Sequence, residues 1–264
     1  MVAATAAGAV QQQPPRFYVW MAIVFVAIAF SGFIPTFWAK VATGATVGRP
    51  VLYLHGVLMF TWTLFVLLQT SLVASRRIAD HRTWGVAGVA LSTAVSFTIV
   101  LVTIASMHEA QSAGLAELGL RASVVQLTNV FLFAGLITAG LLNVKRPEIH
   151  KRLMILAMVP IADPAIARMF RFAFSLSGAP PSPPSAVASP ATVDRLLHLV
   201  AVPSFVADLL IVAAMVYDWR ARGRPHSVYL IGGAIILANR LLYAPLSATP
   251  AWAAIAHWVE SLTV

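Results

Sequence analysis

The sequence predicts an all-α membrane protein: a bundle of seven transmembrane helices with its N-terminus in the cytoplasm and its C-terminus outside. Hydrophobic residues make up 59% of the chain and charged residues only 10%, whereas about a quarter of the residues of a soluble domain are charged. The apolar residues gather in stretches of about 20, the length of a helix that crosses the hydrocarbon core of a bilayer. The lipid bilayer is therefore the expected partner of most of the surface.

The elements follow in order from this pattern. Residues 1–15 are rich in Ala, Gln and Pro and are expected to be a disordered tail. The transmembrane domain is expected over residues 16–249, with spans at about 17–38, 51–75, 84–107, 123–144, 152–172, 194–217 and 227–246. Prolines crowd the segment from Ser175 to Ala191, which predicts an extended connector. Residues 250–264 are expected at the membrane interface, because Trp252 and Trp258 suit the headgroup boundary.

The distribution of Lys and Arg sets the predicted orientation. The larger group falls in one set of loops and comprises Arg16, Arg76, Arg77, Arg82, Lys145, Arg146, Lys151, Arg152, Arg220, Arg222 and Arg224. The smaller group on the other side comprises Lys40, Arg49, Arg121, Arg171 and Arg195. Cytoplasmic loops carry the excess of positive charge. The net charge of +9 is therefore interpreted as a topology signal, and no nucleic-acid partner is expected.

The absence of cysteine excludes disulfides, thiolate catalysis, iron–sulfur clusters and thiolate zinc sites. Three histidines, His81, His150 and His226, each precede a predicted span at its cytoplasmic end. Each lies close to Lys or Arg in the sequence, which disfavours a bound cation. Helix-end capping or contact with lipid phosphates is therefore favoured for them, and no metal site is predicted.

Polar residues inside the predicted spans are the candidate functional residues, because each ionisable group there costs about 2.5–3.5 kcal/mol on insertion scales. Helical spacing places them on stripes of several spans. They are His55 in the second span, Asn129 in the fourth, Asp163 and Arg168 in the fifth, His198 and Asp208 in the sixth, and Arg240 and Tyr243 in the seventh. We expect these stripes to meet in one pocket in the outer half of the bundle.

Three functions are compatible with such a pocket. In the first, His55 and His198 axially ligate a b-type haem whose propionates pair with Arg168 or Arg240. In the second, the chain is a small transporter or solute-binding protein: the two arginines face an anion or polar solute, and Asp163 and Asp208 carry protons, with Asn129 and Tyr243 beside them.

In the third, the chain is an accessory subunit or homo-oligomer whose stripes meet a partner's helices. The polar residues can also simply hold the bundle together, through pairs such as Asp163 with Arg240 or Asp208 with Arg168. An enzymatic activity is left open, because no nucleophile and base stand out as a pair.

Several segments together resemble a large group of bacterial seven-helix inner-membrane proteins. They are HGVLMFTWTLFVLLQTSLVASRRIADHRTWG from His55 to Gly85, HKRLMILAMVPIADPAIAR from His150 to Arg168, and YDWRARGRPHSVYLIGG from Tyr217 to Gly233. The resemblance implies a multi-pass protein of the bacterial inner membrane. That group has no established activity, so the resemblance assigns no catalytic residue.

Overall fold

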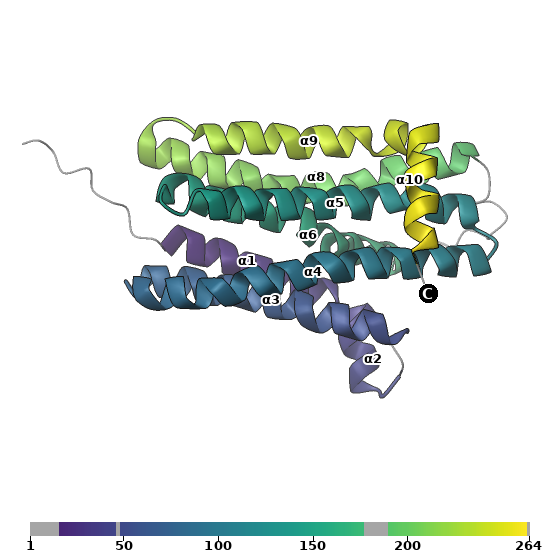
Figure 1. The fold of residues 1–264 in the computed structure, drawn as a ribbon, viewed down its shortest axis with the longest axis horizontal. Helices are drawn as coiled ribbons and strands as arrows, with labels where there is room; N and C mark the ends of the chain where they lie inside the picture. The colour runs from purple at the N-terminus through teal and green to yellow at the C-terminus, as the bar shows by residue number, and fades with distance from the viewer. Residues whose placement is uncertain (1–15, 46–47, 177–189, 263–264) are drawn as a thin grey trace, which may run out of the picture.

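The computed structural model describes residues 16–45, 48–176 and 190–262 (Figure 1). Within these ranges the chain forms helices joined by turns and contains no β-strand, which confirms the predicted all-α class. The predicted tail, residues 1–15, and most of the proline-rich connector, residues 177–189, lie outside the described part of the chain.

The bundle consists of long helices with their axes close to one direction, together with the short segments η1, α2 and α10 (Figure 1). Their bounds are α1 Arg16–Gly32, η1 Ile34–Trp38, α2 Ala39–Ala42, α3 Pro50–Ala74, α4 Ile78–Ser112, α5 Ala116–Leu142, α6 Pro147–Leu176, α8 Pro190–Arg222, α9 Ser227–Ser247 and α10 Pro250–Ser261. Among the described helices, 6 are long and apolar enough to cross a membrane, and α1 with the segment to Ala42 makes up to 7 if this bent pair is one span. These helices are those of a multi-pass membrane protein.

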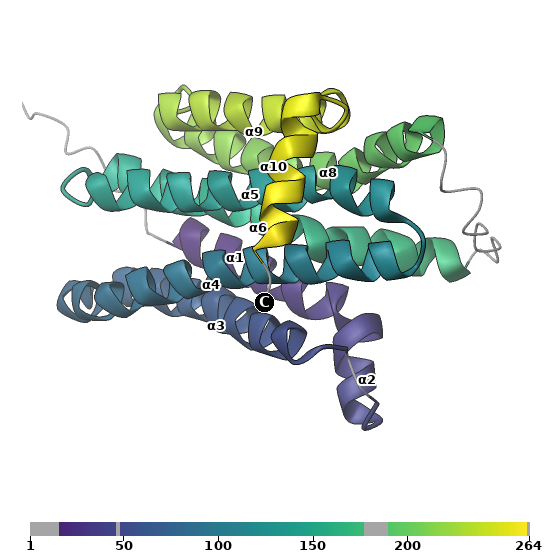
Figure 2. The same cartoon turned by 45° about the vertical axis from the view of Figure 1, so that its right-hand side comes forward.

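Successive long helices run antiparallel, so the turns gather at two ends of the bundle (Figures 1 and 2). We call the end that holds the start of α1 and the turns α3–α4, α5–α6 and α8–α9 the basic end, and the opposite one the far end. At the far end α10 lies across the bundle and packs against α4, α5 and α9. Helix α6 lies at the centre, where it packs against α1, α5, α8 and α9.

Helix α6 combines the most buried surface of the bundle with two prolines. Every residue from Ile155 to Pro160 is buried, because apolar side chains on all faces of a helix suit a central position. A proline lacks an N–H, so the Pro160 carbonyl cannot receive the usual bond from the residue four positions later, which is Pro164. That carbonyl is therefore free for a side chain of another helix.

Helix α1 breaks where it crosses α6. A Cβ atom added at Gly32 would lie 2.4 Å from the backbone oxygen of Ala165, so the two backbones can approach this closely only with glycine there. The chain then turns by 42° into the short π-helix η1, which contains Pro35. Lys40, expected in a loop, lies in α2, which continues η1.

Candidate functional site

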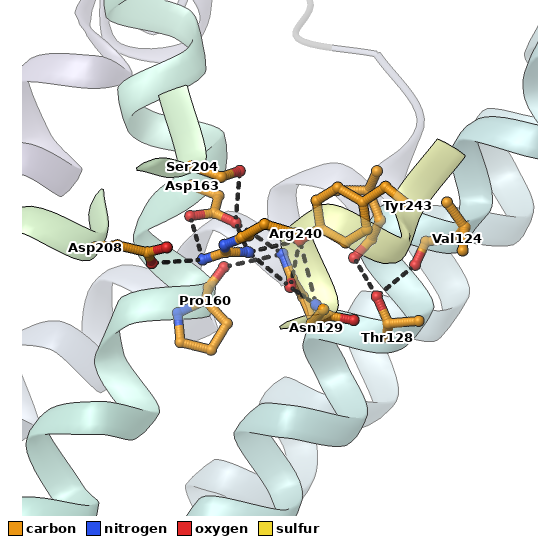
Figure 3. A network of polar contacts seen from close by, with 11 residues as sticks. Val124, Thr128, Asn129, Pro160, Asp163, Ser204, Asp208, Arg240 and Tyr243 are labelled. Carbon is orange, nitrogen blue, oxygen red and sulfur yellow. Dashed lines mark hydrogen bonds and ion pairs between the residues drawn. The ribbon is translucent and has the colours of Figure 1, made fainter. Parts of the chain in front are cut away.

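The most polar part of the bundle interior surrounds Arg240 of α9, whose side chain is almost wholly buried. Its guanidinium makes a two-pronged ion pair with Asp163 of α6, at 2.5 Å and 3.0 Å, and reaches Asp208 of α8 at 3.4 Å. It also donates to the Oδ1 of Asn129 at 3.1 Å and to the hydroxyl oxygen of Tyr243 at 2.5 Å. Figure 3 shows these groups converging from α5, α6, α8 and α9.

The partners of Arg240 also bond to one another. The Nδ2 of Asn129 donates to Asp163 at 2.9 Å and to the freed carbonyl of Pro160 at 3.3 Å. Ser204 of α8 donates to the same carboxylate at 3.1 Å, and the hydroxyl of Tyr243 donates to Asn129 at 2.9 Å. The network thus fixes the relative position of four helices and satisfies Asp163 fully.

The carboxyl group of Asp208 has fewer hydrogen-bond partners than that of Asp163. Its second oxygen, Oδ2, is buried and has no hydrogen-bond partner among the described residues. The site contains two carboxyl groups and one guanidinium, so two ionised carboxylates would leave one negative charge uncompensated at low dielectric, which is costly. A proton on Asp208 would neutralise that charge, and the unpartnered oxygen is the atom that can carry it.

Arg168 lies on a different face of α6 and does not join this network. Its Nη1 donates to the carbonyl of Pro164 at 2.9 Å, and its guanidinium lies over the Phe33 ring, 4.3 Å from the centroid. All 9 acidic residues of the chain lie in the described ranges. None of them forms an ion pair with Arg168. The Arg168 guanidinium therefore has no carboxylate partner among the described residues.

The two histidines predicted as haem ligands do not face each other. His55 of α3 lies near Arg168, close enough for an electrostatic interaction, and its Nδ1 is 3.1 Å from the Thr98 hydroxyl. His198 of α8 is exposed, and its Nδ1 is 2.8 Å from the Asp194 carbonyl. Helix α3 packs against α1 and α4, and α8 packs mainly against α6 and α9. The arrangement does not bring the two imidazoles to one macrocycle.

The residues predicted to share one pocket therefore fall into separate groups. The predicted ion pair of Asp163 with Arg240 is confirmed. Asp208, predicted beside Arg168, pairs instead with Arg240. Arg168 lies against Phe33 at the end of α1, close enough to His55 of α3 for an electrostatic interaction. Asp163 and Arg168 are five residues apart, and at about 100° per residue they point about 140° away from each other. The predicted stripe of the fifth span included both residues, although they point to different sides of the helix.

Two further ion-pair sites, each built on a buried arginine, were not predicted. At the basic end, Arg152 is 1% exposed and bonds to Asp218 at 2.8 Å and 2.5 Å, and Glu148 of α6 joins it at 2.7 Å. At the far end, Arg121 pairs with Asp194. Sequence reasoning placed Arg152 and Arg121 among the loop cations, because both stand at predicted span ends where exposed cations are common.

One of the three basic-end histidines caps a helix. The Nδ1 of His226 accepts the Val228 N–H at the start of α9, as expected for helix-end capping. His150 places its Nδ1 2.9 Å from the Gly140 carbonyl, and its ring centroid is 6.3 Å from that of His81.

In comparisons with models of known families, with curated proteins and with solved structures, nothing matches this chain.

Proposed function

We propose that this chain is a proton-linked transporter or binding protein for a small anion, with Arg168 as the anion ligand and Asp208 as the proton-binding group. The observation that carries the proposal is the Arg168 guanidinium, which lies in a span-length apolar helix with no carboxylate partner. An ionisable residue in such a position is costly and marks a functional site by default.

The direction of the Arg168 side chain supports a ligand role. An arginine inside a span can escape cost by extending toward the membrane surface. Arg168 lies in the far half of α6, yet it bonds to the carbonyl of Pro164, one turn toward the basic end. Its charge is thus directed toward the middle of the bundle, over the Phe33 ring. A planar guanidinium held in this way suits a carboxylate, sulfate or phosphate, which it can bind with two hydrogen bonds.

The charge balance of the Arg240 network supports a proton role. Asp163 already neutralises Arg240 through the shorter contacts, so Asp208 gains little from ionising unless a cation arrives. A carboxyl group of this kind takes up and releases a proton when the helices around it shift. Arg168 lies on the central helix α6. Asp208 lies on α8, which packs against α6.

The proposal also includes the membrane in which the chain lies and its orientation there. By the excess of Lys and Arg at the basic end, we place that end in the cytoplasm of a bacterial cell and the far end outside. Phe33 and the bend of α1 then lie in the outer half of the bundle, and the anion reaches Arg168 from outside. The resemblance to seven-helix bacterial inner-membrane proteins agrees with this placement.

The test is anion binding by the purified chain. Succinate, sulfate and phosphate are added separately, and the thermal unfolding midpoint is measured in detergent. An anion at 100 times its Kd stabilises by about 2.7 kcal/mol, or about 5–10 °C. We expect at least one anion to give such a rise with the wild type, none with Arg168→Gln, and an unchanged rise with Arg195→Gln, an exposed arginine of α8.

Proton linkage is read separately. In liposomes that contain a pH-sensitive dye, a gradient of the binding anion should move protons with the wild type. Asp208→Asn should keep anion binding and abolish the proton signal. A panel that leaves the wild-type midpoint unchanged, or an Arg168→Gln variant that still responds, contradicts the proposal.

A further inference from the structure

An apolar groove opens on the side of the bundle between α5 and α9. Its volume is about 400 Å³, and its walls are α5 from Phe131 to Ala139 and α9 from Ser227 to Ile235, with Leu153 of α6 in its lining. Phe131 and Ile231 on its two walls are 74% and 63% exposed. The groove therefore faces the hydrocarbon of the bilayer and not the interior of the bundle.

The groove is closed toward the far end and reaches the basic end. Beyond its far limit, α5 and α9 are joined by the hydrogen bond from Asn239 to Asn129, at 3.2 Å. At the other limit it includes Ser227, the first residue of α9. Along α9 it extends from Ser227 to Ile235, or about 12 Å at 1.5 Å per residue. A Cβ atom added at Gly135 would meet nothing within 4 Å, so the groove is open at this glycine.

Free cations gather where the groove reaches the basic end. Lys145 and Arg146 lie in the turn that follows α5, Arg220 lies in the last turn of α8, and Arg224 lies between α8 and α9. All four are exposed, and none forms an ion pair with any of the chain's 9 acidic residues, all of which the structure describes. Their neighbour Arg222 is already paired with Glu148.

We propose that this groove and these cations bind an anionic phospholipid, with an acyl chain between α5 and α9 and its phosphate at Lys145, Arg146 and Arg224. The apolar groove matches an acyl chain in polarity, and the cations at its end are complementary in charge to a phosphate. Clusters of Lys and Arg at a membrane surface attract anionic headgroups, and the groove adds a place for the chain. The site does not depend on the proposed anion transport, because it shares no residue with Arg168 or Asp208.

The test is lipid binding by the full chain in detergent, measured by native mass spectrometry. Phosphatidylglycerol should bind with about one molecule per chain, and phosphatidylcholine with the same acyl chains should bind far more weakly. A triple variant, Lys145→Gln, Arg146→Gln and Arg224→Gln, should weaken phosphatidylglycerol binding on the order of a hundredfold, from about fivefold per cation. The matched control replaces Lys40, Arg49 and Arg195, which are exposed cations of the far half, and should leave binding unchanged.

The groove itself is tested by filling it. Gly135→Leu should weaken phosphatidylglycerol binding at least tenfold. The control is Gly85→Leu on α4, where an added Cβ also meets nothing within 4 Å. Glycerol phosphate, a soluble headgroup, should compete poorly because it lacks the chain.

Equal binding of the two lipids, or equal loss in both triple variants, overturns the proposal. Unchanged binding by Gly135→Leu, or strong competition by glycerol phosphate, shows a phosphate site without an acyl chain and overturns it too.

Discussion

Removing each carboxyl group of the Arg240 network should have unequal and strongly coupled effects on stability. In the wild type Asp163 carries the negative charge that neutralises Arg240, and Asp208 is the group with an unpartnered oxygen. Asp208→Asn should therefore cost less than about 1 kcal/mol, because its contact of 3.4 Å is longer than a normal charged hydrogen bond.

Asp163→Asn should cost more but not destroy the fold. Asparagine keeps one of the two acceptor oxygens, so one charge-assisted bond is lost, worth about 1.5–3 kcal/mol. Asp208 then ionises and takes over the neutralisation of Arg240. The same Asp208→Asn substitution in this background should now cost about 3–5 kcal/mol, because it leaves a buried guanidinium with no carboxylate.

The assay is the thermal unfolding midpoint of the four proteins in one detergent at one heating rate. For a chain of this size 1 kcal/mol corresponds to about 2–4 °C. Asp208→Asn should lower the midpoint by less than about 4 °C in the wild type and by about 6–20 °C in the Asp163→Asn background. Equal shifts in the two backgrounds would refute the argument that the two carboxyl groups share one guanidinium.

Three further predictions concern other parts of the molecule. A reporter fused after the C-terminus should behave as periplasmic and one inserted between Arg77 and Arg82 as cytoplasmic; the same result for both contradicts the orientation. Gly32→Ala should destabilise by at least about 1–3 kcal/mol, since its Cβ would lie 2.4 Å from the Ala165 backbone, whereas Gly85→Ala should cost nothing measurable. Burial, followed by the charge of Arg152, lowers the pKa of His226. The contribution of His226 to stability should therefore be fully present above a pH of about 6.5 and fall below it, because the unfolded chain takes up the proton first. A His226→Asn variant, which keeps a cap, should lose less stability at low pH. An identical pH profile for the two proteins would contradict this.

Much of the helical architecture could be predicted because it depends on composition and length alone. Apolar stretches of about 20 residues have few alternatives to a helix when the bilayer is the solvent. The partner of Arg240 could also be anticipated, since a buried guanidinium requires a carboxylate and only Asp163 and Asp208 stand at suitable depth. What the sequence did not contain was the rotation of α6 relative to its neighbours. The 140° between Asp163 and Arg168 follows from their spacing on one helix. The rotation of α6 decides which neighbours they meet, so that Asp163 faces Arg240 and Arg168 faces Phe33.

The buried pair of Arg152 and Asp218 escaped prediction for a different reason. Both residues stand at the ends of their helices, where the sequence pattern is the same for an exposed loop charge and a buried one. The distinction depends on which helices pack there, and here α6 and α8 meet with their charged residues inward. Burial of a charge at a span end is thus a tertiary property, whereas burial in mid-span is already implied by the sequence.

The central position of α6 links these separate features. One helix carries Arg152 near its start, Asp163 at the prolines and Arg168 beyond them, and each faces a different neighbour: α8, α9 and α1. Between Arg152 and Asp163 the segment from Ile155 to Pro160 is buried and apolar, so the two charged layers are insulated from each other in this conformation. Under the proposed function, we expect α6 to move when a proton or an anion passes between these two layers. The prolines at 160 and 164 lie where that movement would begin, because the helix there lacks a backbone hydrogen bond. The same missing bond frees the Pro160 carbonyl for Asn129, so the expected point of bending and the Arg240 network share one physical origin.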